Sequence, residues 1–145
     1  MNIAIASDHA GYDYKQLLKN YLTNQGHEVE DFGCYTSESV DYPDTAHPLA
    51  ISVEEGKNTF GITLCGSGNG ITMTANKHQG IRAALCWNEE ISILAREHNN
   101  ANVLGLPARY LTYLETQKIV DAFLTAEFKG GRHQKRVEKI ALTSK

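Results

Sequence analysis

FGITLCGSGNG, residues 60–70, joins a short apolar run to a glycine-rich turn. Phe60–Cys65 has the length and composition of a buried strand. The turn leads into a segment with helical spacing that extends to about Lys77. A strand followed directly by a helix is half of a βαβ unit, which is typical of α/β proteins. We therefore expect an α/β fold.

The same alternation extends in both directions from this stretch. Helical spacing of apolar residues is found in 14–22, 46–53, 89–98 and 111–123, and a final basic helix is expected over 132–142, after Gly130-Gly131. The polar stretch 34–43 reads as a loop. Four more strands are expected, at Asn2–Ser7, Val29–Phe32, Ile81–Cys86 and Val103–Leu106. Five strands that alternate with helices predict a parallel sheet with helices on both faces.

Length and composition exclude several classes of protein. A chain of 145 residues predicts one domain, residues 1–145, and 41% hydrophobic residues are enough for a core. A net charge of −3 argues against a nucleic-acid-binding protein. No stretch approaches the ~20 apolar residues that span a bilayer, and the amino terminus lacks the pattern of a signal peptide. Three cysteines, an odd number, argue against a disulfide framework and favour the cytoplasm.

The glycine-rich turn is the first candidate for a binding site, because ligands of parallel sheets bind at the carboxyl ends of the strands. Gly66, Gly68 and Gly70 allow a close backbone approach, and free N–H groups at a helix start attract anions. The spacing G-x-G-x-G differs from the dinucleotide fingerprint G-x-G-x-x-G. A glycine-rich turn without a ligand is the alternative.

Three side chains at strand ends could carry acid–base chemistry. Cys65 could be a base or nucleophile, because a helix amino terminus favours a thiolate, or it could be a small buried hydrophobe. The second reading applies to Cys34 and Cys86. His9 could transfer protons with Asp8 beside it, or Asp8 could simply cap the first helix.

Two further groups lie outside the strand ends. His98 ends a helix, where its charge would interact favourably with the helix dipole. Arg132 and Arg136 lie four residues apart and so share one helix face, which suits a phosphate or, alternatively, a solvated basic surface. The six histidines show no metal-ligand spacing, so no metal is expected.

Seven short motifs, in order along the chain, resemble those of type B ribose-5-phosphate isomerases. Each fragment alone is weak, but the ordered set covers residues 7 to 137 and is specific. The wider family includes galactose-6-phosphate and allose-6-phosphate isomerases. The motifs are SDHAG (7–11), DYPD (41–44), CGSGNG (65–70), ANK (75–77), GIRAALC (80–86), REHNNANVL (96–104) and GGRHQKRV (130–137).

This resemblance implies a three-layer αβα Rossmann-like sandwich and a homodimer, or a tetramer, with sites built across the subunit interface. It implies no metal and no organic cofactor. The substrate would be a small sugar phosphate, with no nucleic acid or membrane as partner. The reaction would interconvert D-ribose 5-phosphate and D-ribulose 5-phosphate through an enediolate, a step of the non-oxidative pentose phosphate pathway.

The resemblance also implies a role for each matching residue. Cys65 would move a proton between C1 and C2, Ser67 would assist at the substrate oxygens, and His98 with Asp8 would open the furanose ring. Backbone amides from Gly66 to Gly70, including those of Gly68 and Asn69, would stabilise the enediolate. Sugar hydroxyls would be held by Tyr42 and Asn99. Phosphate would be bound by His9, Arg109, Arg132 and Arg136, the last two from the partner subunit.

Some positions depart from the family pattern. Many relatives have Thr where this chain has Ser67. One branch replaces the cysteine by a glutamate directly after the last loop glycine, but Ile71 occupies that place here, so the chain resembles the cysteine branch. The approach to Arg109, through Gly105-Leu106-Pro107-Ala108, is less glycine-rich than usual. A six-carbon sugar-phosphate isomerase and a non-catalytic phosphosugar-binding module are the alternative functions.

Overall fold

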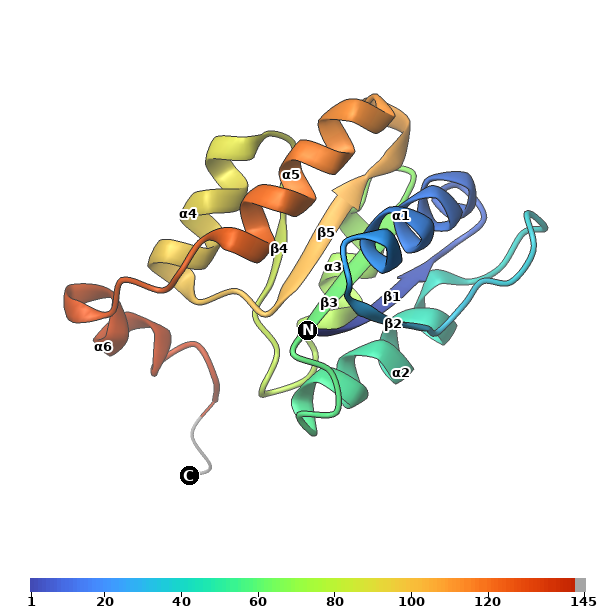
Figure 1. Ribbon diagram of the computed structural model, residues 1–145. Helices are drawn as coiled ribbons and strands as arrows, with labels where there is room; N and C mark the ends of the chain where they lie inside the picture. The colour runs from blue at the N-terminus through green and yellow to red at the C-terminus, as the bar shows by residue number, and fades with distance from the viewer. Residues whose placement is uncertain (143–145) are drawn as a thin grey trace.

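All strands of the sheet are parallel and lie in the order β2-β1-β3-β5-β4 (Figure 1). The computed structural model describes residues 1–142. β3 has the predicted bounds and lies in the middle of the sheet, so the expected five-stranded parallel sheet is confirmed. The strands are β1 (Asn2–Ser7), β2 (Glu28–Asp31), β3 (Phe60–Cys65), β4 (Ala83–Leu85) and β5 (Val103–Pro107).

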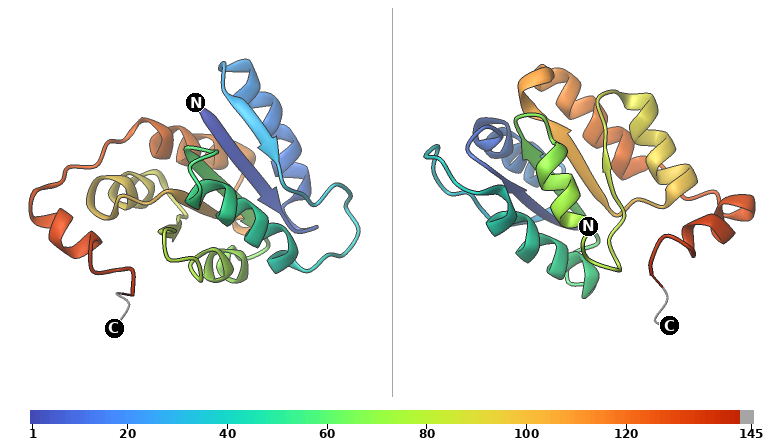
Figure 2. Two further views of the ribbon diagram at one scale, coloured as in Figure 1. Left: turned by 90° about the horizontal axis from the view of Figure 1, so that it is seen from below. Right: turned by 180° about the vertical axis from the view of Figure 1, so that it is seen from behind.

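Helices cover both faces of this sheet, which confirms the three-layer arrangement (Figures 1 and 2). α1, α4 and α5 share one hydrophobic cluster with the sheet, and α2 and α3 share another on the opposite face. The helices are α1 (Tyr12–Asn24), α2 (Tyr42–Glu54), α3 (Asn69–Ala75), α4 (Glu89–Asn99), α5 (Tyr113–Thr125) and α6 (Gln134–Val137).

The alternation of side chains along β1 explains both clusters. Ile3 and Ile5 point to the α1 and α5 face, and Ala4 and Ala6 point to the α2 face. All four side chains are fully buried, as expected for a strand covered on both sides. The small alanines leave room for Leu49 and its neighbours on α2 to pack against the sheet.

The fourth strand is shorter than predicted, because the Asn102 side chain replaces a backbone partner just before it. The Arg82 N–H donates to Oδ1 of Asn102 at 2.8 Å rather than to the backbone of β5. Ala83 pairs with Val103 of β5, and its own N–H and carbonyl bind the Asn76 amide at 2.8 Å and 2.9 Å. Regular strand geometry therefore begins only at Ala83, and not at Ile81.

The last predicted helix is also shorter. A short 3-10 helix, η2 (Gly131–His133), leads into the four-residue α6, and residues 138–140 form only turns. No side chain of α6 is buried, and Figure 2 shows α6 standing apart from the sheet. A segment without a packed apolar face gains too little to stay helical. The prediction that Arg132 and Arg136 share one continuous helix is therefore wrong.

The helix expected over 111–123 is shifted by two residues, because the chain provides a cap that periodicity does not reveal. Thr112 accepts from the Glu115 N–H through its hydroxyl, and the Glu115 carboxylate accepts from the Thr112 N–H at 2.7 Å. This reciprocal capping box starts α5 at Tyr113. Among residues 1–142, no helix is both long and apolar enough to cross a membrane.

Candidate active site

A cavity of about 510 Å³ opens at the carboxyl ends of β1 and β3. These strands are neighbours, but the chain leaves β1 for β2 and returns to β3 on the other side. Such a point of reversal in a parallel sheet is where ligands bind. The cavity is lined by Asp8, His9, Ala10, Ser39, Val40, Asp41, Tyr42, Cys65, Gly66, Ser67, Gly70 and Arg109.

Cys65 is the last residue of β3 and lies in the wall of this cavity, with 4% of its surface exposed. Burial is the main cause that raises the pKa of the Cys65 thiol, and the charge of Asp8 raises it further. Hydrogen bonds from the N–H groups of Ile71, Gly68 and Ser67 lower this pKa, but by less than burial and Asp8 raise it. The donors at the start of α3 thus act to favour the thiolate, as expected, but desolvation outweighs them, so that the net shift of the Cys65 pKa is upward.

The glycines of the turn are needed to let neighbouring side chains approach. Gly68 has a φ of +75° and precedes α3. A Cβ on Gly68 would lie 2.4 Å from Cδ1 of Leu85, and a Cβ on Gly70 would lie 2.4 Å from Cζ of Tyr42. The turn therefore presents bare backbone to the cavity, and the Tyr42 ring lies directly against it.

Asp8 organises the turn between β1 and α1. One of its carboxylate oxygens accepts from the N–H groups of Ala10, at 2.9 Å, and Gly11, at 3.2 Å. The residue in the N-cap position is Gly11, so the interpretation of Asp8 as the helix cap is wrong, although its carboxylate does bind backbone N–H groups. Because Asp8 also lines the cavity, both a structural and a chemical role remain open to it.

Two cationic or titratable groups face the same cavity. The Val40 N–H donates to Nδ1 of His9 at 3.4 Å, which leaves Nε2 as the other ring nitrogen for a ligand. Arg109, in the short 3-10 helix η1 (Ala108–Tyr110), donates its N–H to the Gly66 carbonyl at 3.1 Å. Nη1 of Arg109 would lie 3.2 Å from a Cβ on Gly66, so the guanidinium packs on the turn. An anion in the cavity would meet both groups.

Four of the predicted site residues do not line the Cys65 cavity: His98, Asn99, Arg132 and Arg136. α4 runs from Glu89 to Asn99, so His98 and Asn99 lie about 14–15 Å along its axis from Glu89, toward the amino edge of the sheet. Asn99 lines a different cavity, of about 570 Å³, together with Asn76 and Leu142. Asp8 and His98 are therefore not neighbours within one chain.

The basic carboxyl-terminal segment lies beside the end of α4. The rings of His98 and His133 stack with their centres 4.2 Å apart, and the Lys129 N–H donates to the Glu97 carbonyl at 3.0 Å. Desolvation, followed by the charges of His98, Arg132, Arg136 and Lys129, lowers the pKa of His133. Arg132 and Arg136, in η2 and α6, belong to this group and not to the Cys65 cavity.

Part of the cavity wall comes from a segment that the sequence pattern identifies only as a loop. Ser39, Val40 and Asp41, within residues 34–43, line the cavity. The signal was the DYPD motif, which places the start of α2 beside this loop. No group of side chains that could hold a metal ion is found within residues 1–142.

Comparison with known proteins adds an independent finding. Residues 3–140 match the family model described as Ribose/Galactose Isomerase. A probable ribose-5-phosphate isomerase B from Mycoplasma genitalium is 46% identical over 141 residues, which cover 96% of this chain and 93% of the relative.

Solved structures agree with this match over nearly the full length. A ribose 5-phosphate isomerase from Thermotoga maritima superposes with a TM-score of 0.95 at 51% identity and covers 97% of each chain. The Mycoplasma genitalium enzyme, solved with bound ribulose-5-phosphate, has a TM-score of 0.93 at 45% identity, over 96% of this chain and 93% of that one.

Proposed function

Because this chain belongs to the ribose/galactose isomerase family, we propose that it interconverts D-ribose 5-phosphate and D-ribulose 5-phosphate. The observation that carries the proposal is the place of Cys65, whose thiol lies among backbone N–H groups in the wall of a cavity that also holds His9 and Arg109. A base, oxyanion donors and a phosphate site are the three things that this reaction requires.

The reaction begins when the Cys65 thiolate removes the proton from C2 of the open-chain aldose. The electron pair of the broken C–H bond forms a C1–C2 double bond, and negative charge develops on the C1 oxygen. N–H groups of the turn from Gly66 to Gly70 stabilise this charge, and Ser67 delivers a proton to the oxygen. The raised pKa of the thiol makes its thiolate a strong base for a weakly acidic carbon.

The second half of the reaction reverses these steps at the neighbouring carbon. The thiol returns its proton to C1, while Ser67 accepts the hydroxyl proton at C2, where the ketone forms. One base on one face of the sugar therefore serves both carbons. Binding of the remote phosphate by His9 and Arg109 positions C1 and C2 at the sulfur.

A second copy of the chain would complete the site. Arg132, Arg136 and Asn99 do not line the Cys65 cavity in one chain, and α6 stands apart from the sheet (Figure 2). In a homodimer, the basic segment of one copy would reach the cavity of the other, where Arg132 and Arg136 would bind phosphate. Tyr42 of one copy and Asn99 of the other would hold sugar hydroxyls, and His98 of the second copy would meet Asp8 and open the furanose ring.

The test is proton exchange in deuterated water, followed by NMR with ribose 5-phosphate as substrate. The wild-type protein should form ribulose 5-phosphate and incorporate deuterium, whereas Cys65→Ala should lose turnover by at least about three orders of magnitude and keep its fold. Near-native turnover by Cys65→Ala would remove the cysteine from the mechanism. If the wild-type protein bound the substrate without exchange, it would be a binding module.

We place the reaction in the non-oxidative pentose phosphate pathway and in the cytoplasm, both of which remain predictions.

A further inference from the structure

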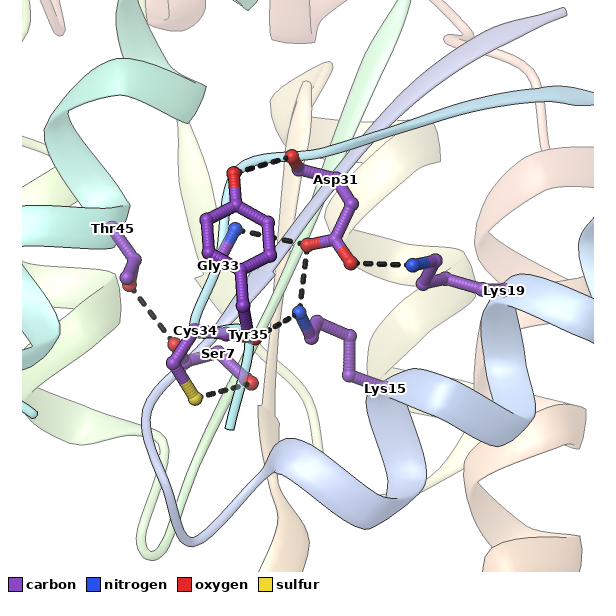
Figure 3. Close-up of polar contacts among 8 residues, drawn as sticks. All are labelled: Ser7, Lys15, Lys19, Asp31, Gly33, Cys34, Tyr35 and Thr45. Atoms are coloured by element: carbon purple, nitrogen blue, oxygen red, sulfur yellow. Dashed lines mark hydrogen bonds and ion pairs between the residues drawn. The ribbon is translucent and has the colours of Figure 1, made fainter. Parts of the chain in front are cut away.

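Lys15 is a charged residue that the proposed reaction does not use, and its side chain is fully buried. It lies in the first turn of α1, and its ammonium donates to Oδ1 of Asp31 at 2.7 Å and to the Cys34 carbonyl (Figure 3). The rings of Tyr12 and Tyr35 lie 5.7 Å and 5.5 Å from the nitrogen. A buried ammonium is tolerated only with such partners, so the chain maintains this arrangement against a desolvation cost.

Asp31 links Lys15 to the backbone that follows β2. The carboxylate oxygen that accepts from Lys15 also accepts from the Gly33 N–H at 2.9 Å. Burial acts to raise the pKa of Asp31, but hydrogen bonds from Lys15, Lys19 and Gly33 outweigh it, so that the pKa is lowered. Asp31 therefore fixes Gly33 through its N–H, and Lys15 fixes Cys34 through its carbonyl.

Gly33 and Cys34 in turn hold the end of β1. The Ser7 N–H donates to the Gly33 carbonyl at 2.6 Å, and the Cys34 N–H donates to the Ser7 carbonyl at 2.8 Å. The same Ser7 carbonyl accepts from the Thr45 hydroxyl of α2 at 3.1 Å (Figure 3). The loop between Cys34 and Thr45 is thus tied to Ser7 at both of its ends.

These contacts connect Lys15 to two of the segments that line the Cys65 cavity, although Lys15 itself does not line it. Asp8 and His9, which follow Ser7 directly, form one of these two walls. Val40 and Tyr42, from the loop and the start of α2, form the second. We propose that Lys15 is a positioning residue that sets the spacing of these two walls through Asp31, Cys34 and Ser7; the inference rests on the proposed function, because substrate binding is its readout.

Lys19 provides a matched control on the same helix. It donates to the other oxygen of Asp31 at 2.6 Å, but its side chain is 30% exposed. Lys19 has no hydrogen bond to Cys34 among residues 1–142. Lys19→Met therefore removes an ion pair with Asp31 and leaves the contact with the loop backbone intact.

The experiment measures kcat and KM for ribose 5-phosphate, with thermal unfolding as a separate readout. We expect Lys15→Met to raise KM at least about tenfold and to change kcat by less than about threefold, because His9 and Tyr42 contact the substrate before and during the reaction. Lys19→Met should stay within about twofold of wild type in both. A wild-type KM for Lys15→Met would overturn the proposal.

A double variant separates positioning from stability. Lys15→Met alone leaves Asp31 short of a cation, so it should lower the unfolding temperature, and Lys15→Met/Asp31→Asn should regain much of that loss. The proposal requires that the double variant keep a raised KM, because nothing then holds the Cys34 carbonyl. A return to the wild-type KM, or a failure of both variants to fold at low temperature, would show that Lys15 only stabilises the fold. If the wild-type protein itself failed to turn over ribose 5-phosphate, the proposed function would fail instead.

Discussion

The ring of Tyr42 lies against the backbone of Gly70, so closely that a Cβ on Gly70 would come within 2.4 Å of the ring carbon Cζ. Gly70 lies in the first turn of α3, its backbone is not in the left-handed region, and the Tyr42 ring atoms are the nearest ones that a Cβ would meet. Gly70→Ala should therefore keep the helix and displace Tyr42.

We expect this displacement to raise KM for ribose 5-phosphate about tenfold or more, since Tyr42 is assigned to a sugar hydroxyl. Steady-state kinetics together with urea unfolding would measure both effects. Tyr42→Phe keeps the ring and is the control that reports on the hydroxyl alone. An unchanged KM in Gly70→Ala would mean that the ring position does not matter for binding.

Asp8 should influence the pH dependence of the reaction through Cys65. Its negative charge contributes to the raised pKa of the thiol, after burial. Because the thiolate is the reactive form, kcat/KM should rise with pH through the thiol pKa, and Asp8→Asn should move that rising limb toward lower pH.

A pH profile of kcat/KM for wild type and Asp8→Asn would check this shift independently of any loss in absolute rate. Asp41→Asn is the matched control, because Asp41 also lines the cavity but is not among the groups that shift the Cys65 pKa. A limb that stays in place in Asp8→Asn, or that moves equally in Asp41→Asn, would contradict the assignment.

Arg96 should stabilise the turn that carries His98 and Asn99. Its guanidinium lies 4.6 Å from the centre of the Phe60 ring and donates to the Ala101 carbonyl at 2.6 Å, while its Nε is buried without a partner in the described residues. Arg96→Met should cost roughly 2–3 kcal/mol of unfolding free energy, through the lost hydrogen bonds and ring contact.

Arg96→Lys should recover little of this loss, since a planar guanidinium is needed both to stack and to donate in that geometry. Urea unfolding of the two variants would measure the difference. Full stability in Arg96→Lys would show that charge alone is what the site requires.

Mixed dimers would test the shared site. Cys65→Ala or Arg136→Ala in both copies should impair both sites of the proposed homodimer. A mixed dimer holds one copy of each variant. One of its sites then combines the intact Cys65 of one copy with the intact Arg136 of the other. Random exchange of equal amounts should restore about a quarter of the wild-type sites. The assay is turnover at low substrate before and after exchange, and its control is the mixture of Cys65→Ala with Cys65→Ser, which should recover nothing. No recovery after confirmed exchange would mean that the Cys65 and Arg136 of one site come from the same copy, and it would contradict a site shared between copies.

The sheet and the position of its functional edge were predictable from local patterns. Asn2–Ser7 and Phe60–Cys65 have their predicted bounds, because a strand covered on both faces must be apolar throughout. Boundaries differ from the prediction where a side chain replaces a backbone partner, as Asn102 does for the Arg82 N–H, or where side chains form a cap, as with Thr112 and Glu115. The final helix was predicted too long, because charge spacing alone does not reveal whether a helix has anything to pack against.

Sequence alone was sufficient to place Cys65 and the glycine turn at the end of a central strand, since chain order determines which residues follow a strand. Only the tertiary structure could decide what surrounds the thiol. Burial raises its pKa despite nearby N–H donors, and the loop at Ser39–Asp41 lines the cavity. Tertiary structure also separates His98 from Asp8, and it buries Lys15 behind two of the segments that line the Cys65 cavity. These properties depend on distances between segments far apart in the chain, and no local pattern of residues encodes such distances.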